Sequence, residues 1–285
     1  MRFGYVFEPF IPSLPAKDIS EYIQIVKRFS EFELRFKENY PAIDGNISST
    51  VSILGELCKK VYSVHVHNIK LSKPTEHPNS EFISCMKSLY AKFPSLKIIT
   101  FHCGNGGMNY LLRNLKTIEE NFSKEELKVK LACENMPNIG SNLNSLEDVR
   151  EFHSETKKMK KVGLCIDTSH IPTIPQIQPY SQTHLNSEYQ PHFDKFRNIG
   201  YEYSYLICKY LSQAGEKLYH VHISDFTEDT SRKDHLMPGS GILAWNLILQ
   251  TLSQMRYEGK CVIELRTEDC NLDNFEKSIK SLSSF

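Results

Sequence analysis

The sequence carries no excess of charge of either sign. Lysine and arginine together number 34 among 285 residues, and aspartate and glutamate also number 34. A chain with this balance has no general electrostatic attraction to nucleic acid or to an anionic membrane. The composition therefore disfavours a protein that binds polyanions non-specifically, although it leaves room for a local basic patch.

Paired cysteines and long apolar runs are also absent. The eight cysteines stand singly, without a C-x-x-C motif. Cys133, Cys165 and Cys261 lie in apolar runs, where a free thiol behaves as a small hydrophobe. This usage predicts a reducing, cytoplasmic compartment. No run reaches the length of a membrane span, and the first residues lack the apolar segment of a signal peptide, so we expect no membrane association.

What the sequence does contain is a strict alternation of short apolar runs with longer amphipathic ones. The strand-like runs are 2–7, 32–36, 61–67, 97–102, 129–134, 162–167, 218–223 and 261–265. The helical patterns are 18–29, 49–60, 79–93, 110–122, 145–159, 197–215, 244–255 and 272–282. Alternating strands and helices indicate a parallel sheet. Eight such units predict an α/β fold, a single (β/α)8 TIM barrel that spans residues 1–285.

One connection is much longer than the others. Residues 171–196 separate the sixth strand-like run from the next helix and are rich in Pro, Tyr, Gln and His. Loops of this length in compact domains are usually lids, binding loops or disordered segments. We predict a lid over the active site, with four side chains that reach the substrate: Tyr180, His184, Tyr189 and His192. A shorter Pro-rich segment, 7–17, is expected to be a loop over the same face.

Six successive strand-like runs end in a histidine or an acidic residue. These residues are His67, His102, Glu134, Asp167 (with His170 in the following turn), His222 (followed by Asp225) and Glu264, and His235 lies in the next loop. The carboxyl ends of the strands of a TIM barrel converge on its active site. Burying unpaired carboxylates is costly, and only Lys70 and Arg266 bring positive charge near these ends. Because imidazole and carboxylate bind divalent metals, the pattern predicts a metal site.

Two of these runs contain His-Val-His, with His65 and His67 in one and His220 and His222 in the other. Residues two apart on a strand point to the same face, so each pair lies at two depths of the barrel interior. We expect His67 and His222, at the strand mouths, to be metal ligands. We expect His65 and His220 to be core residues or hydrogen-bonding partners that orient their neighbours.

Several motifs resemble the xylose isomerase-like TIM barrels, the superfamily of sugar isomerases, epimerases and endonuclease IV. CIDTSH (165–170) resembles the CIDTCH of endonuclease IV (AP endonuclease family 2), with Ser169 in place of the cysteine. ENMPNIGSNL (134–143) resembles the Glu-Asn turn and Gly-Ser-Asn-Leu of the same family. DHLMPGSGILAW (234–245) is closer to the sugar phosphate isomerase/epimerase branch. The resemblance runs from the third strand-like run to the eighth.

The resemblance to endonuclease IV implies a site for three zinc ions. The first zinc would take His67, His102 and Glu134, the second Glu134, Asp167, His222 and Glu264, and the third His170 and His235. An Asp expected two positions before the last histidine is Lys233 here, with Asp234 one residue away and Asp229 further back. In the epimerase branch, one metal would take Glu134, Asp167, His222 and Glu264, and the two glutamates would also be the acid–base pair.

Two chemistries follow from the resemblance. In the first, zinc ions lower the pKa of a bound water to roughly 7 and hydrolyse a phosphate ester, with Glu134 holding the attacking hydroxide. In the second, one Mn, Mg or Co ion binds a sugar while Glu134 and Glu264 move a proton to and from carbon. Three histidines that a one-metal epimerase does not need, His67, His102 and His170, favour hydrolysis. The neutral charge, the 235–245 loop and Glu33 favour isomerisation.

Since eight of nine endonuclease-type ligand positions are filled, the sequence predicts an enzyme, a phosphoesterase of the apurinic/apyrimidinic-site type with two or three zinc ions. The alternative is a metal-dependent sugar or sugar phosphate isomerase/epimerase. A non-catalytic metal-binding barrel is a third possibility. The substrate would be a small sugar, a phosphate ester or abasic DNA, and no obligate protein partner is expected.

Overall fold

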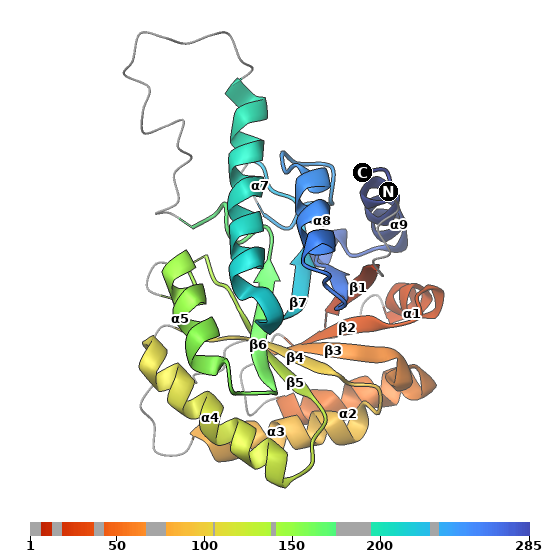
Figure 1. The fold of residues 1–285 in the computed structure, drawn as a ribbon. Helices are drawn as coiled ribbons and strands as arrows, with labels where there is room; N and C mark the ends of the chain where they lie inside the picture. Colours follow the sequence, from red (N-terminus) through yellow and green to blue (C-terminus); the bar gives the residue numbers. More distant parts are fainter. Residues whose placement is uncertain are drawn as a thin grey trace.

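The computed structural model of the chain describes residues 7–12, 19–36, 43–66, 78–104, 106–137, 141–174, 195–228 and 234–285. Within them, eight parallel strands form a closed barrel in sequence order, and the last strand pairs with the first. Helices surround the strands (Figure 1). The predicted TIM barrel is therefore confirmed. That one domain spans residues 1–285 stays a prediction.

The strands and helices follow the predicted alternation. The strands are β1 (Phe7–Pro12), β2 (Phe32–Phe36), β3 (Val61–Val66), β4 (Ile98–His102), β5 (Lys130–Glu134), β6 (Val162–Asp167), β7 (Leu218–Ile223) and β8 (Cys261–Ile263). The helices are α1 (Ile19–Arg28), α2 (Ile43–Leu54), α3 (Pro78–Lys92), α4 (Met108–Lys124), α5 (Leu146–Thr156), α7 (Lys195–Ala214), α8 (Trp245–Gln254) and α9 (Leu272–Leu282). Short 3₁₀ turns are η1 (Gly55–Lys60), η2 (Gly215–Lys217) and η3 (Thr267–Asp269). Among the described helices, none has both the length and the apolar character needed to cross a bilayer.

The first strand lies later in the chain than predicted. Residues 7–12 form β1, whereas the sequence pattern placed a strand at 2–7 and a loop at 7–17; residues 2–6 lie outside the described ranges. The prolines were interpreted as loop residues, but proline fixes φ near the extended region and is excluded only where the sheet needs its N–H. Pro9 pairs with β8 and Pro12 with β2, so both belong to the barrel wall.

Two further boundaries differ from the prediction. Helix α2 begins at Ile43 rather than at residue 49 and ends at Leu54. Gly55 follows with φ 51°, a left-handed conformation that ends helices. The segment predicted to be a lid, 171–196, is described only at its ends, where Ile171 and Ile174 are buried in the hydrophobic core and α7 begins at Lys195; that the rest is a lid stays a prediction. The four lid side chains, Tyr180, His184, Tyr189 and His192, lie outside the described residues.

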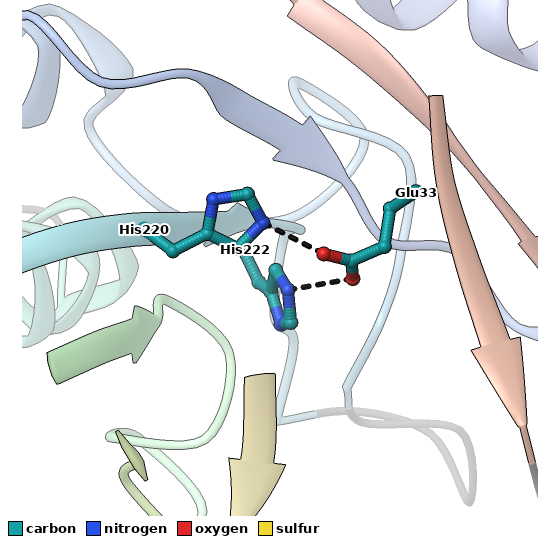
Figure 2. A group of neighbouring side chains, drawn as sticks. All are labelled: Glu33, His220 and His222. Atoms are coloured by element: carbon teal, nitrogen blue, oxygen red, sulfur yellow. Dashed lines mark hydrogen bonds and ion pairs between the residues drawn. The ribbon is translucent and has the colours of Figure 1, made fainter. Parts of the chain in front are cut away.

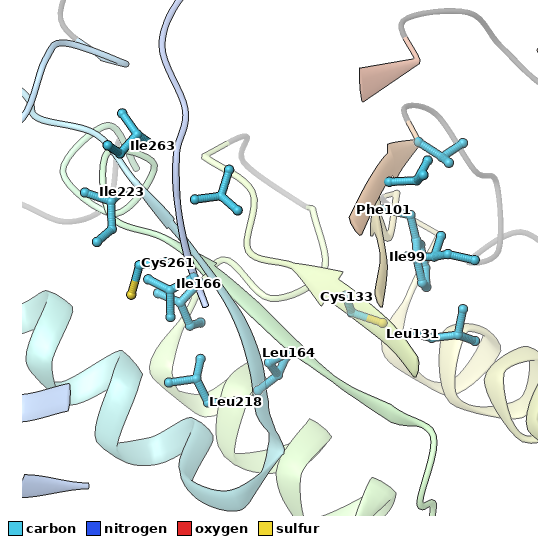
Figure 3. Packing of buried hydrophobic residues seen from close by; sticks show 14 of the residues in the cluster. Ile99, Phe101, Leu131, Cys133, Leu164, Ile166, Leu218, Ile223, Cys261 and Ile263 are labelled. Carbon is cyan, nitrogen blue, oxygen red and sulfur yellow. The ribbon is translucent and has the colours of Figure 1, made fainter. Parts of the chain in front are cut away.

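Side chains of strands β4, β5 and β6 alternate between two environments. Residues such as Ile99, Phe101, Leu131 and Leu164 are buried in the hydrophobic core (Figure 3). The residues between them belong to the second environment, which holds both a small apolar cluster, Ile98, Ala132 and Cys165, and polar residues such as Thr100, Glu134 and Asp167. The strands pair so that His102 lies beside Glu134 and Asp167 beside His222. The register therefore brings residues that are far apart in sequence to the same height inside the barrel.

Candidate metal centre and active site

The polar side chains gather at the carboxyl ends of the strands. The predicted ligands that the structure describes come from seven places: His102 ends β4, Glu134 ends β5, Asp167 ends β6, His170 lies in the next turn, His222 lies on β7, Glu264 directly follows β8, and His235 lies before α8. Glu134, Asp167 and His222 are fully buried, and Glu264 is 2% exposed. His67 lies outside the described residues.

Glu134, His222 and Glu264 form the centre of this group. Nδ1 of His222 lies 2.9 Å from Oε1 of Glu134 and 2.7 Å from Oε2 of Glu264. Two buried carboxylates thus converge on a single imidazole nitrogen. This is an arrangement of oxygen and nitrogen donors that suits a divalent cation.

The second oxygen of Glu134 faces two more histidines. Oε2 lies 3.0 Å from Nε2 of His65 and 2.9 Å from Nε2 of His102. His65 is expected one layer deeper than the ligands, and in the sheet it pairs with Thr100, two residues before His102. Its side chain nevertheless reaches the same carboxylate oxygen as His102, and its role as ligand or supporting residue stays a prediction. These three side chains are close enough to hold a metal ion together.

A third group lies around Asp167. Its Oδ2 is 3.9 Å from Nε2 of His170 and 3.8 Å from Nδ1 of His235, and the three also form a candidate ligand group. Asp234, the nearest substitute for the missing endonuclease carboxylate, is instead paired with Arg266 at 2.5 Å. Lys233 and Asp229 lie outside the described residues. Within the described ranges, the third endonuclease-type site therefore has both histidines but not its own carboxylate.

Asp167 is held in place by its neighbours. Its Oδ1 accepts hydrogen bonds from the backbone N–H and the hydroxyl of Ser169, at 2.7 and 2.9 Å. Its backbone N–H donates to Oδ1 of Asn135 at 2.7 Å. Nδ1 of His170 lies 2.9 Å from the backbone carbonyl of Asn135. The CIDTSH and ENMPN motifs are thus joined by hydrogen bonds that fix one carboxylate and one imidazole.

Buried oxygens in this group fit a metal ion. Oε2 of Glu134, Oε2 of Glu264 and Oδ2 of Asp167 are buried and face histidine nitrogens as ion pairs, without the geometry of a hydrogen bond. Buried polar atoms normally have a hydrogen-bond partner, and burying several carboxylates together is costly. A divalent cation among these oxygens would add positive charge and a direct ligand contact, so the donor set is consistent with metal binding. The geometry does not identify the metal.

The protonation of the site follows from the same proximity. Burial by itself raises the pKa of Glu134, but His65 and His222 outweigh it and hold that pKa well below its usual range. Burial also opposes ionisation of Glu264, yet His222 keeps the pKa of Glu264 well below normal. Conversely, burial lowers the pKa of His222, and the surrounding glutamates raise it well above the ordinary value. Carboxylates and imidazole therefore stabilise each other's charged forms.

Two residues of β2, Glu33 and Arg35, belong to the site although the sequence pattern does not place them in the ligand set. Glu33 is fully buried and contacts both His220 and His222 (Figure 2). Arg35 lies 3.3 Å from Oε1 of Glu264 through its Nη1. The available signal was the pattern FELRF, in which a Glu and an Arg share one face of a short, otherwise apolar strand.

Asp225, in contrast, supports a loop. Its carboxylate accepts hydrogen bonds from Nε1 of Trp245 and from the backbone N–H of Gly239, both at 2.8 Å. Its backbone pairs with Leu236, next to His235. Gly241 packs so closely that a Cβ there would overlap Oδ1 of Asp225. The DHLMPGSGILAW motif thus folds around this carboxylate, and the fold holds His235 near Asp167.

This fold and this cluster of buried acids and histidines define a TIM barrel with a candidate metal centre at the strand ends. The chain belongs to the xylose isomerase-like TIM barrel family, whose model matches residues 90–285. No curated protein matches the chain.

Solved structures with the same fold are mostly sugar epimerases. 3-Keto-D-glucoside 4-epimerase YcjR from E. coli has a TM-score of 0.63 and 16% identity, covering 98% of this chain and 99% of that chain. D-Psicose 3-epimerase from Clostridium cellulolyticum H10, solved with D-tagatose, has a TM-score of 0.62 and 14% identity, covering 100% of this chain and 98% of that chain. The "probable 3-DHS dehydratase AsbF" of Bacillus anthracis has a TM-score of 0.63 and 13% identity, covering 96% of this chain and 97% of that chain. At such identities the likeness shows the fold alone.

These neighbours are enzymes, and they fit the isomerase/epimerase alternative better than the phosphoesterase predicted from the sequence. The number of filled endonuclease-type ligand positions does not separate the two activities well, because four of those positions match the epimerase pattern equally well. Neither zinc nor hydrolysis is supported by the comparisons.

Proposed function

We propose that the protein is a divalent-metal-dependent sugar isomerase or epimerase in which Glu134 and Glu264 are the acid–base pair. The observation that carries the proposal is the convergence of these two buried carboxylates on Nδ1 of His222, at 2.9 and 2.7 Å. Two of the sugar epimerases among the solved structures with this fold, YcjR and D-psicose 3-epimerase, support it. The substrate is a small sugar with a carbonyl group next to the reacting carbon.

Four residues would hold the metal ion, namely Glu134, Asp167, His222 and Glu264. When bound, the ion would chelate adjacent substrate oxygens and make the neighbouring C–H bond more acidic. Glu134 and Glu264 would then remove a proton from carbon and return one. They reach the site from β5 and from the end of β8, so they can address a substrate from two directions.

Arg35 has a supporting role in this proposal. Its Nη1 lies 3.3 Å from Oε1 of Glu264, whereas Oε2 of the same carboxylate faces His222 at 2.7 Å. The two oxygens are therefore distinguished by their partners. Arg35 orients the carboxylate so that Oε2 faces the centre of the site.

Phosphate-ester hydrolysis is the second candidate, and one observation favours it. His65 and His102 both face Oε2 of Glu134, which gives a possible second metal position that a one-metal epimerase does not need. Against it, Asp234 pairs with Arg266 rather than with a third ligand group, and the chain has no net positive charge to attract DNA.

Metal content and substrate turnover test the proposal together. The purified chain is stripped with a chelator, reloaded with Mn, Mg, Co or Zn, and assayed by elemental analysis per chain. Each form is then tried on ketohexoses, ketose phosphates and a duplex with an abasic site. We expect one tight metal equivalent and interconversion of a ketose, abolished by Glu264→Gln, which keeps size and removes charge. Cleavage of the duplex with two or three zinc ions per chain would contradict the proposal.

A further inference from the structure

We propose that Glu33 is a positioning residue that fixes the orientation and tautomer of His222, so that Nδ1 is the metal-binding nitrogen. The inference rests on the proposed metal centre and adds a residue to it. Glu33 lies on β2, on the side of His222 away from Glu134 and Glu264. It is neither a predicted ligand nor part of the acid–base pair.

Glu33 lies between His220 and His222 and contacts both (Figure 2). Oε2 of Glu33 accepts a hydrogen bond from Nε2 of His220 at 2.7 Å, and Oε1 lies 2.9 Å from Nε2 of His222 as an ion pair. All three side chains are fully buried. One carboxylate thus holds both histidines of the HVH segment of β7.

The two nitrogens of His222 consequently have different partners. Nε2 faces Glu33, and Nδ1 faces Glu134 and Glu264. An ionised carboxylate can only accept, so an imidazole that binds a metal through Nδ1 keeps its remaining proton on Nε2, beside Glu33. The other nitrogen, Nδ1, lies on the side of the two glutamates proposed to share the metal. The partner of one ring nitrogen decides which nitrogen binds metal.

His220 explains why Glu33 can act in this way. A carboxylate with one partner could turn about its own side chain, but its second oxygen is fixed by Nε2 of His220. The role of His220 is therefore indirect, through Glu33. This accounts for the spacing of the second His-Val-His: the outer histidine faces the metal position, and the inner one holds the carboxylate that orients it.

Three variants and one matched control test the inference. Glu33→Met keeps an unbranched side chain of similar length and removes the acceptor. Glu33→Gln keeps a carbonyl that can still accept from Nε2. Ser63→Ala is the control, because Ser63 pairs with Glu33 in the sheet and is also fully buried. His220→Gln perturbs Glu33 from the far side.

The measurements are the dissociation constant of Mn²⁺ for the chelator-stripped protein, by calorimetry, and circular dichroism to confirm folding. Loss of a residue that orients a metal-binding histidine typically weakens affinity by roughly 10- to 100-fold. We expect that loss in Glu33→Met, a smaller loss in Glu33→Gln and His220→Gln, and no change in Ser63→Ala. A folded Glu33→Met with the affinity of the original chain would overturn the inference.

A spectroscopic measurement on the unmodified chain keeps the test decisive if Glu33→Met does not fold. Zn²⁺, which is diamagnetic, is used as the probe, and ¹⁵N shifts of the imidazoles are recorded. His222 is expected to show a protonated Nε2 and a metal-bound Nδ1. A protonated Nδ1 with Nε2 bound would refute the assignment. A chain that binds no metal at all would refute the proposed function itself, so the two failures are distinguishable.

Discussion

Replacing Asp225 by Asn should destabilise the fold without removing metal. Asp225 follows β7 closely, and the sequence placed it among the acidic groups of the strand ends. In the structure its carboxylate accepts four hydrogen bonds: Oδ1 from the backbone N–H of Phe226 and Leu243, and Oδ2 from the backbone N–H of Gly239 and from Nε1 of Trp245. In Asn, an NH₂ group replaces one of the two oxygens.

The magnitude follows from which donors lose their acceptor. The amide oxygen can replace Oδ1 and retain two bonds, so Gly239 and Trp245 would then face a donor. Gly239 is exposed and can turn to water, whereas Trp245 is fully buried. A hydrogen bond to a charged group contributes about 1.5–3 kcal/mol. We therefore expect Asp225→Asn to lower the free energy of unfolding by about 2–3 kcal/mol, most of it from the indole.

Chemical denaturation of the metal-free protein measures this loss, and elemental analysis of the reloaded protein measures the metal. Trp245→Phe removes the donor and completes a double-mutant cycle with Asp225→Asn. Trp245→Phe should lower the free energy of unfolding much less in the Asp225→Asn variant than in the original chain. Additive losses would show that the Trp–Asp bond is not the cause. Loss of a metal equivalent in Asp225→Asn would show that Asp225 is a ligand.

Three further predictions concern other parts of the site. His102→Ala removes one of two histidines at Oε2 of Glu134. Under the epimerase proposal, ketose turnover should fall only modestly. A fall of several orders of magnitude, with loss of a second metal ion, would favour hydrolysis. His220→Ala leaves Glu33 without its hydrogen bond; stability should fall by about 3–5 kcal/mol while saturating metal content is unchanged, as judged by denaturation and elemental analysis. Asp234→Asn breaks a partly exposed pair with Arg266 and should cost less than about 1 kcal/mol at pH 7. Burial opposes ionisation of Asp234, but His235 and Arg266 lower its pKa below 3.8. Ionised Asp234 therefore stabilises the folded chain at pH values above 3.8. As the pH falls through the lowered pKa, Asp234 becomes protonated, and the difference in free energy of unfolding between Asp234→Asn and the original chain should vanish.

The sequence by itself determined the barrel and the membership of most of the site. Alternation of apolar runs with amphipathic ones is set by local chain geometry, and eight repeats leave few ways to bury both faces of a parallel sheet. Because strand ends of such a barrel meet, Glu134, Asp167, His222 and Glu264 could be placed together without coordinates. The strand at 7–12 was missed because proline is a poor guide to loop structure where a strand does not use its N–H.

Only the tertiary structure decided which groups contact which. The chain shows that His65, His220, Glu33 and Asp225 are polar residues in or after apolar strands, but not which partner each one meets. Those partners depend on strand register and on the direction of side chains across the barrel, and Glu33 and His220 are 187 positions apart in the chain. Contacts over such separations are set by the closure of the whole barrel. Local sequence therefore predicted the place of the site, and the closed barrel determined its pairings.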